Sequence, residues 1–149
     1  MTFSGLVEEG PGQVAELTIG LRVGKPRRGS LLRRCGAVIE PQVATDEILK
    51  LRTRQVGGRA ASATITRCEG RWLGGPGEPT LVCQIEHVPS PRERLRITFE
   101  RHMQALAERT ALRFGQQEVW LRMGGKLYRA NAPGEPAPKM LRPGGRVIR

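Results

Sequence analysis

The sequence predicts a single α+β domain of ferredoxin-like type, in which an antiparallel sheet carries two helices on one face. Residues 14–23 alternate between apolar and polar side chains, as a half-buried strand requires. Residues 61–72 and 80–88 are two further strand-like segments around a turn-rich connection. Residues 95–110 instead repeat apolar side chains at helical spacing. With a short helix after the first strand and a closing strand, the order is the split βαβ arrangement.

The first strand is predicted over residues 14–23. Leu17, Ile19 and Leu21 lie on one side of this segment, and Arg22 lies on the other. Successive side chains of a strand point to opposite faces, so the apolar set should face the core.

A loop is expected over residues 24–44, which are rich in Gly, Pro and Arg. Loops of this length are uncommon unless they are functional or disordered. Thr45 or Asp46 can cap the short helix that follows, and Gly57 with Gly58 can end it.

Residues 61–72 and 80–88 should pair antiparallel as a hairpin, because the connection between them is rich in Gly and Pro. A symmetric hairpin would place Cys68 opposite Cys83. We therefore expect two neighbouring, reduced core thiols.

The second helix has the clearest boundaries. Ser90, Pro91 and Glu93 supply an N-cap, a first-turn proline and a capping-box partner, and the helix should end near Phe114 and Gly115. Its apolar stripe is formed by Leu95, Phe99, Met103 and Leu106. A strand over 119–123 and a short strand over 126–130 should then be joined by the turn Gly124-Gly125.

The length and composition fit one core. The chain has 149 residues, of which 38% are hydrophobic, and a core for about 100 residues is the usual single-domain size. We expect a domain over residues 14–130, a flexible N-terminus over 1–13, and a basic tail rich in Pro and Gly over 131–149. The tail has no periodicity.

Two short motifs carry a resemblance to a known family. These are Gly70-Arg71-Trp72, before the hairpin connection, and the segment 113–119, after the second helix. With this order of elements, residues 14–123 resemble a family of small bacterial α+β proteins of unknown function. The resemblance implies the fold and carries no activity.

The charge of the chain favours an anionic ligand. Twenty-five Lys and Arg residues stand against 14 Asp and Glu, which gives a net charge of +11. Such an excess attracts phosphate backbones and acidic partners. The densest basic run lies in and beside the predicted loop and contains Arg22, Lys25, Arg27, Arg28, Arg33 and Arg34.

The sheet face without helices is a second candidate surface. It is expected to display Arg22, Gln84, Glu86, Trp120 and Arg122, with Arg67 as a further candidate. Arginines beside a tryptophan can hold a phosphate and stack a base. The alternative, which we favour for this face, is that two copies of it pack together in a homodimer.

From these observations we predict a non-enzymatic, cytoplasmic binding protein for nucleic acid or another polyanion. Arg27, Arg28, Arg33 and Arg34 would grip phosphates, and the C-terminal arginines would assist. Neutralising about six phosphates should lower the affinity about a thousandfold between 50 and 200 mM salt.

Two alternatives stay open. In the first, the protein binds or converts a small acidic metabolite in a pocket between the sheet and the second helix or at a dimer interface, with His87 and Glu86 as weak catalytic candidates. Adjacent strand residues point to opposite faces, which separates this pair. In the second, the chain is an adaptor that docks on an acidic protein.

Common signatures of other functions are missing from the sequence. It contains no Walker loop, no dinucleotide fingerprint, no Gly-x-Ser-x-Gly and no paired Cys-x-x-Cys motif. We therefore expect no metal site and no cofactor. Three cysteines without a paired framework fit a reducing compartment. No stretch reaches the roughly 20 apolar residues that cross a bilayer, so we expect no membrane partner.

Overall fold

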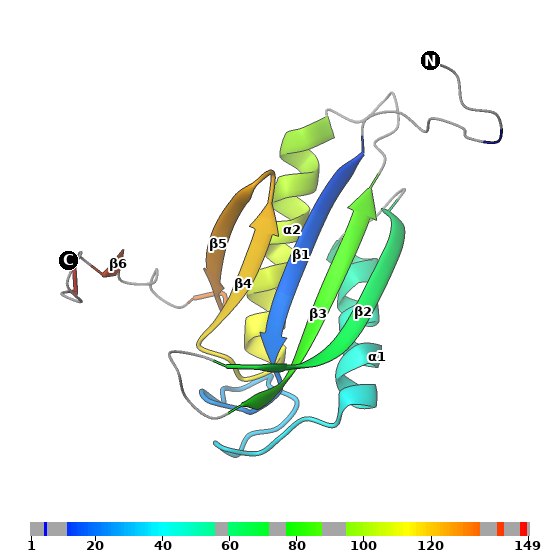
Figure 1. The fold of residues 1–149 in the computed structure, drawn as a ribbon. Coiled ribbons are helices and arrows are strands. Elements are labelled where there is room, and N and C mark those ends of the chain that lie inside the picture. The colour runs from blue at the N-terminus through cyan, green and yellow to red at the C-terminus, as the bar shows by residue number, and fades with distance from the viewer. Residues whose placement is uncertain are drawn as a thin grey trace.

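The computed structural model describes residues 5, 12–55, 60–71, 77–87, 95–134, 140–141 and 147–148. Its main body is an open sheet of five strands with two helices (Figure 1). The elements in chain order are β1 (Gln13–Gly20), α1 (Pro41–Gln55), β2 (Ala60–Gly70), β3 (Glu78–His87), α2 (Leu95–Arg113), β4 (Glu118–Met123) and β5 (Lys126–Asn131). The prediction of an α+β protein with an antiparallel sheet and two helices is thereby confirmed.

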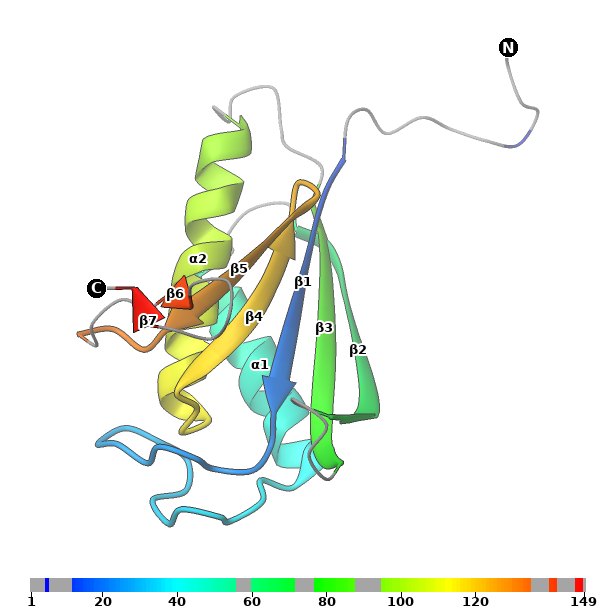
Figure 2. The same cartoon turned by 60° about the vertical axis from the view of Figure 1, so that its left-hand side comes forward.

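The strands lie in the order β2-β3-β1-β4-β5, and every neighbouring pair is antiparallel. Both helices pack on the same side of the sheet (Figure 2). α2 contacts β1, β4 and β5, whereas α1 contacts β2 and α2. The opposite side of the sheet has no covering element in the described part of the chain.

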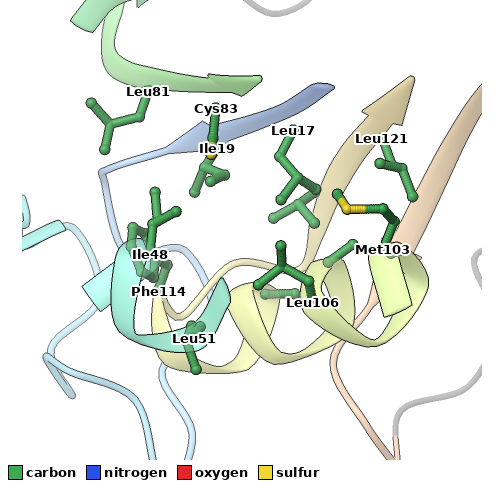
Figure 3. Close-up of a cluster of buried hydrophobic side chains, with 14 of the residues drawn as sticks. Leu17, Ile19, Ile48, Leu51, Leu81, Cys83, Met103, Leu106, Phe114 and Leu121 are labelled. Atoms are coloured by element: carbon green, nitrogen blue, oxygen red, sulfur yellow. The ribbon is translucent and has the colours of Figure 1, made fainter. Parts of the chain in front are cut away.

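The core lies between the sheet and the helices. Alternate residues of the strands supply its sheet side, and Figure 3 shows them facing the helices: Leu17, Ile19, Leu81, Cys83 and Leu121. The helices contribute Ile48, Leu51, Met103 and Leu106, together with Phe114 just after α2. Burial of such a side chain stabilises the fold by about 1.5–3 kcal/mol. The alternation that predicted the strands therefore also predicted which side is buried.

α1 begins at Pro41, four residues before the predicted cap at Thr45. Proline suits the first position of a helix because its fixed φ matches the helix and its missing N–H has no helical partner there. The Ala44 amide donates to the carbonyl of Glu40, and the Thr45 hydroxyl donates to the carbonyl of Pro41. Thr45 therefore lies inside the helix and does not cap it, and the preceding loop ends before residue 41.

The segment between β1 and α1 continues the pairing of the central strand β1 beyond its end. Arg22 forms an isolated antiparallel bridge with Val38, the Leu21 amide donates to the Pro79 carbonyl, and the Ile39 amide donates to Leu21. The expected long loop therefore has defined hydrogen bonds at both ends.

The hairpin of β2 and β3 is antiparallel, as predicted, but its register differs from the symmetric one. Cys68 lies opposite Thr80, and Cys83 lies opposite Ile65. Cys68 is exposed and Cys83 is buried. The predicted pair of neighbouring core thiols is therefore wrong, because the centre of the hairpin is not midway between the cysteines.

At the other end of the sheet, Gly124 and Gly125 join β4 to β5 with φ angles of 58° and 75°. Two positive φ angles are the geometry that glycine allows in a tight hairpin turn, as predicted. The predicted N-cap of α2 lies outside the described residues, as do nearly all of residues 1–13. Within the predicted tail, two short segments, β6 (Met140–Leu141) and β7 (Val147–Ile148), pair with each other.

Candidate functional site

The predicted phosphate-binding loop packs against the C-terminal end of α2. The Nη1 atom of Arg27 donates to the carbonyls of Gln116 (2.9 Å) and Ala111 (3.4 Å). The Ser30 hydroxyl donates to the carbonyl of Leu112 at 2.8 Å. The last carbonyls of a helix have no helical partners and carry partial negative charge. Arg27 therefore has a structural role at this helix end.

The other arginines of this segment differ in their surroundings. Arg22 is exposed, and its Nη1 atom donates to the carbonyl of Gly36 at 3.2 Å. Two arginines of the predicted phosphate-binding surface, Arg22 and Arg27, thus donate hydrogen bonds to backbone carbonyls. The side chains of Arg28, Arg33 and Arg34 are exposed. The C-terminal arginines predicted to assist them lie outside the described residues.

Trp120 and Arg122 lie on the uncovered face of the sheet, where the sequence placed them. Trp120 is half-buried, and the guanidinium of Arg129 lies 5.7 Å from its ring centroid. Arg129 also forms an ion pair with Glu118 at 3.8 Å. Arg67, a further candidate for this face, instead reaches Gln42 of α1 at 3.1 Å and so lies on the helix side.

His87 and Glu86 do not form a catalytic pair. Glu86 is exposed on the uncovered face, whereas His87 is 4% exposed on the helix side. The His87 ring stacks on Phe99 of α2, with centroids 5.2 Å apart and planes 4° from parallel. This placement follows the alternation of strand side chains. Packing against α2 is therefore the visible role of His87.

In the described part of the chain, no three His, Cys, Asp or Glu side chains gather closely enough to bind a metal ion. Neither of the two described helices is long and apolar enough to cross a membrane.

A groove with a volume of about 830 Å³ lies between α2 and β5. One wall is a polar stripe of α2, where Glu100, Gln104 and Glu108 recur at four-residue spacing. Such residues lie on one face of a helix. Gln104 Nε2 donates to Glu108 Oε1 at 3.2 Å, which orients one of the two carboxylates.

The floor and the opposite wall of this α2–β5 groove come from the sheet. Leu121, Met123 and Ala130 supply apolar surface, and Tyr128 contributes an aromatic side chain that is 41% exposed. Arg101, Arg129 and Asn131 add polar groups, and residues 132–134 close one end. Two carboxylates and two guanidinium groups thus surround an apolar floor, a mixture suited to a small polar ligand with an apolar part.

A second hollow of about 510 Å³ adjoins the first. The two share Glu100 and Met123, and the second extends past Phe99 to Gln13 and the β4–β5 turn. Phe99, which lines this second hollow, is the residue on which His87 stacks.

The sequence predicted a pocket between the sheet and the second helix as an alternative, but with His87 and Glu86 as its candidates, and the residues that line this groove were missed. The sequence does contain a pattern that belongs to one wall of the groove, because Glu100, Gln104 and Glu108 form a polar stripe beside the apolar stripe of the same helix. A polar stripe on a helix usually faces solvent, and its position beside Tyr128 depends on how β5 joins the sheet edge. That placement is a property of the tertiary structure.

No family model matches the sequence, and no curated protein matches it. Solved structures of a phage SAM lyase have a similar fold. In its apo state that enzyme matches with a TM-score of 0.56 and 17% identity, over 91% of this chain and 100% of the other. In its complex with S-methyl-5'-thioadenosine the TM-score is 0.53 and the identity 18%, with the same coverage. The TM-scores show a similar fold, and at this low identity the likeness shows the fold alone.

These comparisons contradict the prediction of a nucleic-acid-binding protein. The structures that share the fold belong to an enzyme named for a small molecule, and they favour the alternative of a small-molecule-binding protein or enzyme. The physical reason for the error lies in the loop, where the hydrogen bonds of Arg27 and Arg22 account for part of the basic run. A charge excess by itself does not select a ligand.

Proposed function

We propose that the protein binds a small, sulfur-containing adenosine compound in the α2–β5 groove. The observation that carries this proposal is the fold match to a SAM lyase, one structure of which holds S-methyl-5'-thioadenosine. The groove supplies the second support, because its walls have both polar and apolar groups. Sulfonium and thioether adenosines combine the same two kinds of group.

The dimensions of the groove support a ligand of this size. Small-molecule sites usually have volumes of about 300–1,000 Å³, and the groove holds about 830 Å³. The adjoining hollow behind Glu100 would leave room for the part of the ligand beyond the sulfur atom.

The side chains of the groove offer a partner for each part of such a ligand. The ring of Tyr128 can pack against a purine, since aromatic faces stack on flat heterocycles. Glu100 and Glu108 can accept hydrogen bonds from ribose hydroxyls or attract a sulfonium or ammonium charge. Arg101 can attract a ligand carboxylate. In a chain with a net charge of +11, two carboxylates on one helical stripe favour a cationic group locally.

We further infer a ferredoxin-like core. The order β2-β3-β1-β4, with α1 after β1 and α2 after β3, supports this assignment. β5 would then be an addition at the β4 edge, and this added strand supplies Tyr128 to the groove.

Titration calorimetry with S-methyl-5'-thioadenosine and S-adenosylmethionine tests the proposal. We expect saturable binding of at least one compound, and Tyr128→Ala or Glu100→Gln should weaken it about tenfold, because each removes a contact worth about 1.4 kcal/mol. Glu40→Gln is the matched control, since Glu40 is exposed and lies outside the groove. Absence of binding, or equal weakening in the control, would reject the proposed site.

A turnover assay separates an enzyme from a binding protein. The protein is incubated with S-adenosylmethionine, and release of S-methyl-5'-thioadenosine is followed by chromatography. Release that is abolished by Glu100→Gln would establish catalysis in the groove. Binding without release would establish a binding protein.

A further inference from the structure

β5 is an edge strand of the sheet, and its residues 128–131 line the α2–β5 groove. An edge strand bonds to its neighbour on one side and presents backbone N–H and C=O groups on the other. β5 can therefore bring backbone hydrogen-bonding groups to the groove as well as side chains.

The β4–β5 turn sets the direction of these backbone groups. Both glycines of the turn have positive φ angles, and the flanking residues Met123 and Lys126 lie opposite each other. In such a turn the amide of the last residue donates to the carbonyl of the first, so Lys126 bonds to β4. Along an antiparallel pair, residues that exchange hydrogen bonds alternate with residues that do not. Every second residue after Lys126 therefore also bonds to β4, and the N–H and C=O of Arg129 point away from β4.

The side chain of Arg129 is engaged elsewhere. Its guanidinium lies 5.7 Å from the centroid of the Trp120 ring, and Nη1 lies 3.8 Å from Glu118 Oε2. Within the described part of the chain, no residue hydrogen-bonds to the outward N–H or C=O of Arg129. A ligand in the groove can therefore meet a donor and an acceptor side by side on the backbone of this residue.

We propose that the backbone N–H and C=O of Arg129 bind the adenine base of the ligand, an inference that rests on the proposed function. Adenine carries the complementary pair, because its N6 amino group is a donor and the neighbouring ring nitrogens N1 and N7 are acceptors. The Arg129 carbonyl accepts from the amino group, and the Arg129 N–H donates to a ring nitrogen. The base thus lies where the next strand of a larger sheet would pair.

Tyr128 adds a contact with the face of the base. It lies opposite Leu121, whose side chain is buried under the helices, so Tyr128 is on the helix side of β5. The Tyr128 side chain is 41% exposed, which leaves its ring accessible for stacking. Two consecutive residues of one strand thus recognise the edge and the face of the purine.

The outer edge of β5 suits a base better than another strand. Lys126 begins β5, and lysine on an edge strand opposes pairing with a further chain. Pro133 lies two residues after the strand and has no N–H with which to extend a ladder. A purine needs only one outward-facing residue, and Arg129 is such a residue in the lining of the groove.

Titration calorimetry with edited bases tests the inference. The probe is S-methyl-5'-thioadenosine, which is compared with its analogue in which hydrogen replaces the N6 amino group. We expect the analogue to bind at least about tenfold more weakly, because the Arg129 carbonyl loses its donor. The 3-deaza analogue is the control, and its affinity should change less than about threefold, since N3 lies on the opposite edge of adenine.

Arg129→Pro and Arg129→Ala separate the backbone of this residue from its side chain. Both variants lack the guanidinium, but only the proline variant also lacks the N–H. Because this N–H points away from β4, the proline removes no hydrogen bond of the sheet. We expect Arg129→Pro to bind S-methyl-5'-thioadenosine at least about tenfold more weakly than Arg129→Ala. Circular dichroism compares the folding of the two variants.

Amide exchange followed by NMR gives a readout that needs no variant. Saturating S-methyl-5'-thioadenosine should slow the exchange of the Arg129 N–H at least about tenfold, because the ligand protects it. Leu127 is the matched control, since its N–H also points away from β4 but the residue lies outside the groove.

The results distinguish this inference from the proposed function. If S-methyl-5'-thioadenosine binds and Tyr128→Ala weakens it, the groove is the ligand site. Equal affinity of the two bases, or of the proline and alanine variants, would then exclude recognition of adenine by Arg129 and leave the proposed function in place. Absence of any binding would reject the proposed function, and this inference with it.

Discussion

At the scale of single residues, burial decides the chemistry of Cys83. The side chain is fully buried, and desolvation raises the pKa of its thiol from 9.0 to about 11, although the positive charge of Arg52 opposes part of this rise. The thiolate therefore forms at lower pH in the unfolded chain than in the native protein. The free energy of unfolding should fall by about 2–3 kcal/mol as the pH rises through this interval.

Thermal denaturation between pH 8 and pH 11 checks this expectation. The loss of stability with pH should be smaller in Cys83→Ala than in the wild type, because the variant lacks the titrating group. In the native protein, Cys35 and Cys68 should react rapidly with a thiol reagent and Cys83 only after unfolding, since the first two are exposed. Rapid reaction of all three cysteines would contradict the burial of Cys83.

At the scale of elements, the basic loop stabilises the end of α2. Arg27 donates to two carbonyls at this end, and hydrogen bonds from charged groups contribute about 1.5–3 kcal/mol. We expect Arg27→Met to lower the free energy of unfolding by about 2 kcal/mol. The neighbouring Arg28→Met should change it by less than about 0.5 kcal/mol, because Arg28 is exposed. Urea denaturation compares the two, and equal effects would exclude the structural role of Arg27.

An ion pair joins the two helices. Arg113 Nε lies 2.7 Å from Glu47 Oε1, and Arg113 Nη1 also donates to the carbonyl of Gly29. The Glu47 side chain is only 9% exposed, so little water can replace it beside Arg113. Removal of the Glu47 carboxylate therefore leaves the Arg113 guanidinium without this acceptor. We expect Glu47→Ala to destabilise the protein by about 2 kcal/mol, less than a fully buried pair because Arg113 is partly solvated.

The control for this pair is the exposed one between Arg71 and Glu69. Their side chains are 67% and 63% exposed, and the charged atoms lie 3.6 Å apart. Surface pairs of this kind contribute at most about 1 kcal/mol, so Glu69→Ala should have little effect. Equal destabilisation by Glu47→Ala and Glu69→Ala would contradict the expectation that the more buried ion pair contributes more to stability.

At the scale of the whole molecule, the groove follows from the relative widths of the two layers. Two packed helices cover about 20 Å, whereas a sheet of five strands spans about 24 Å. α2 contacts β1, β4 and β5, and β5 is an edge strand of the sheet. β5 therefore lies at the margin of the helix layer. The polar stripe of α2 and the residues of β5 then form facing walls. Addition of β5 to the sheet is therefore what creates the candidate site.

Much of the fold could be predicted from the sequence. Alternation identified the buried side of β1 and β4, and the same rule correctly separated His87 from Glu86. Glycines located the β4–β5 turn because two positive φ angles demand them. These predictions succeeded because each depends on local geometry that neighbouring residues determine.

The predictions that failed concern contacts between distant segments. The register of the β2–β3 hairpin was wrong for the cysteines, because the pairing with β1 and the core also constrains β3. The basic loop was interpreted as a phosphate-binding surface, although Arg27 contacts residues more than 80 positions away. Composition records how many arginines are present and contains no information on the carbonyls that they reach.

By itself, the sequence determined the periods of the strands and helices, their order and the burial of one sheet face, since these depend on the side chains of consecutive residues. The tertiary structure decided the strand order, the helix-capping role of the loop and the α2–β5 groove. Each of these depends on which distant segments meet, and the free energy of such contacts arises only when the whole chain has packed.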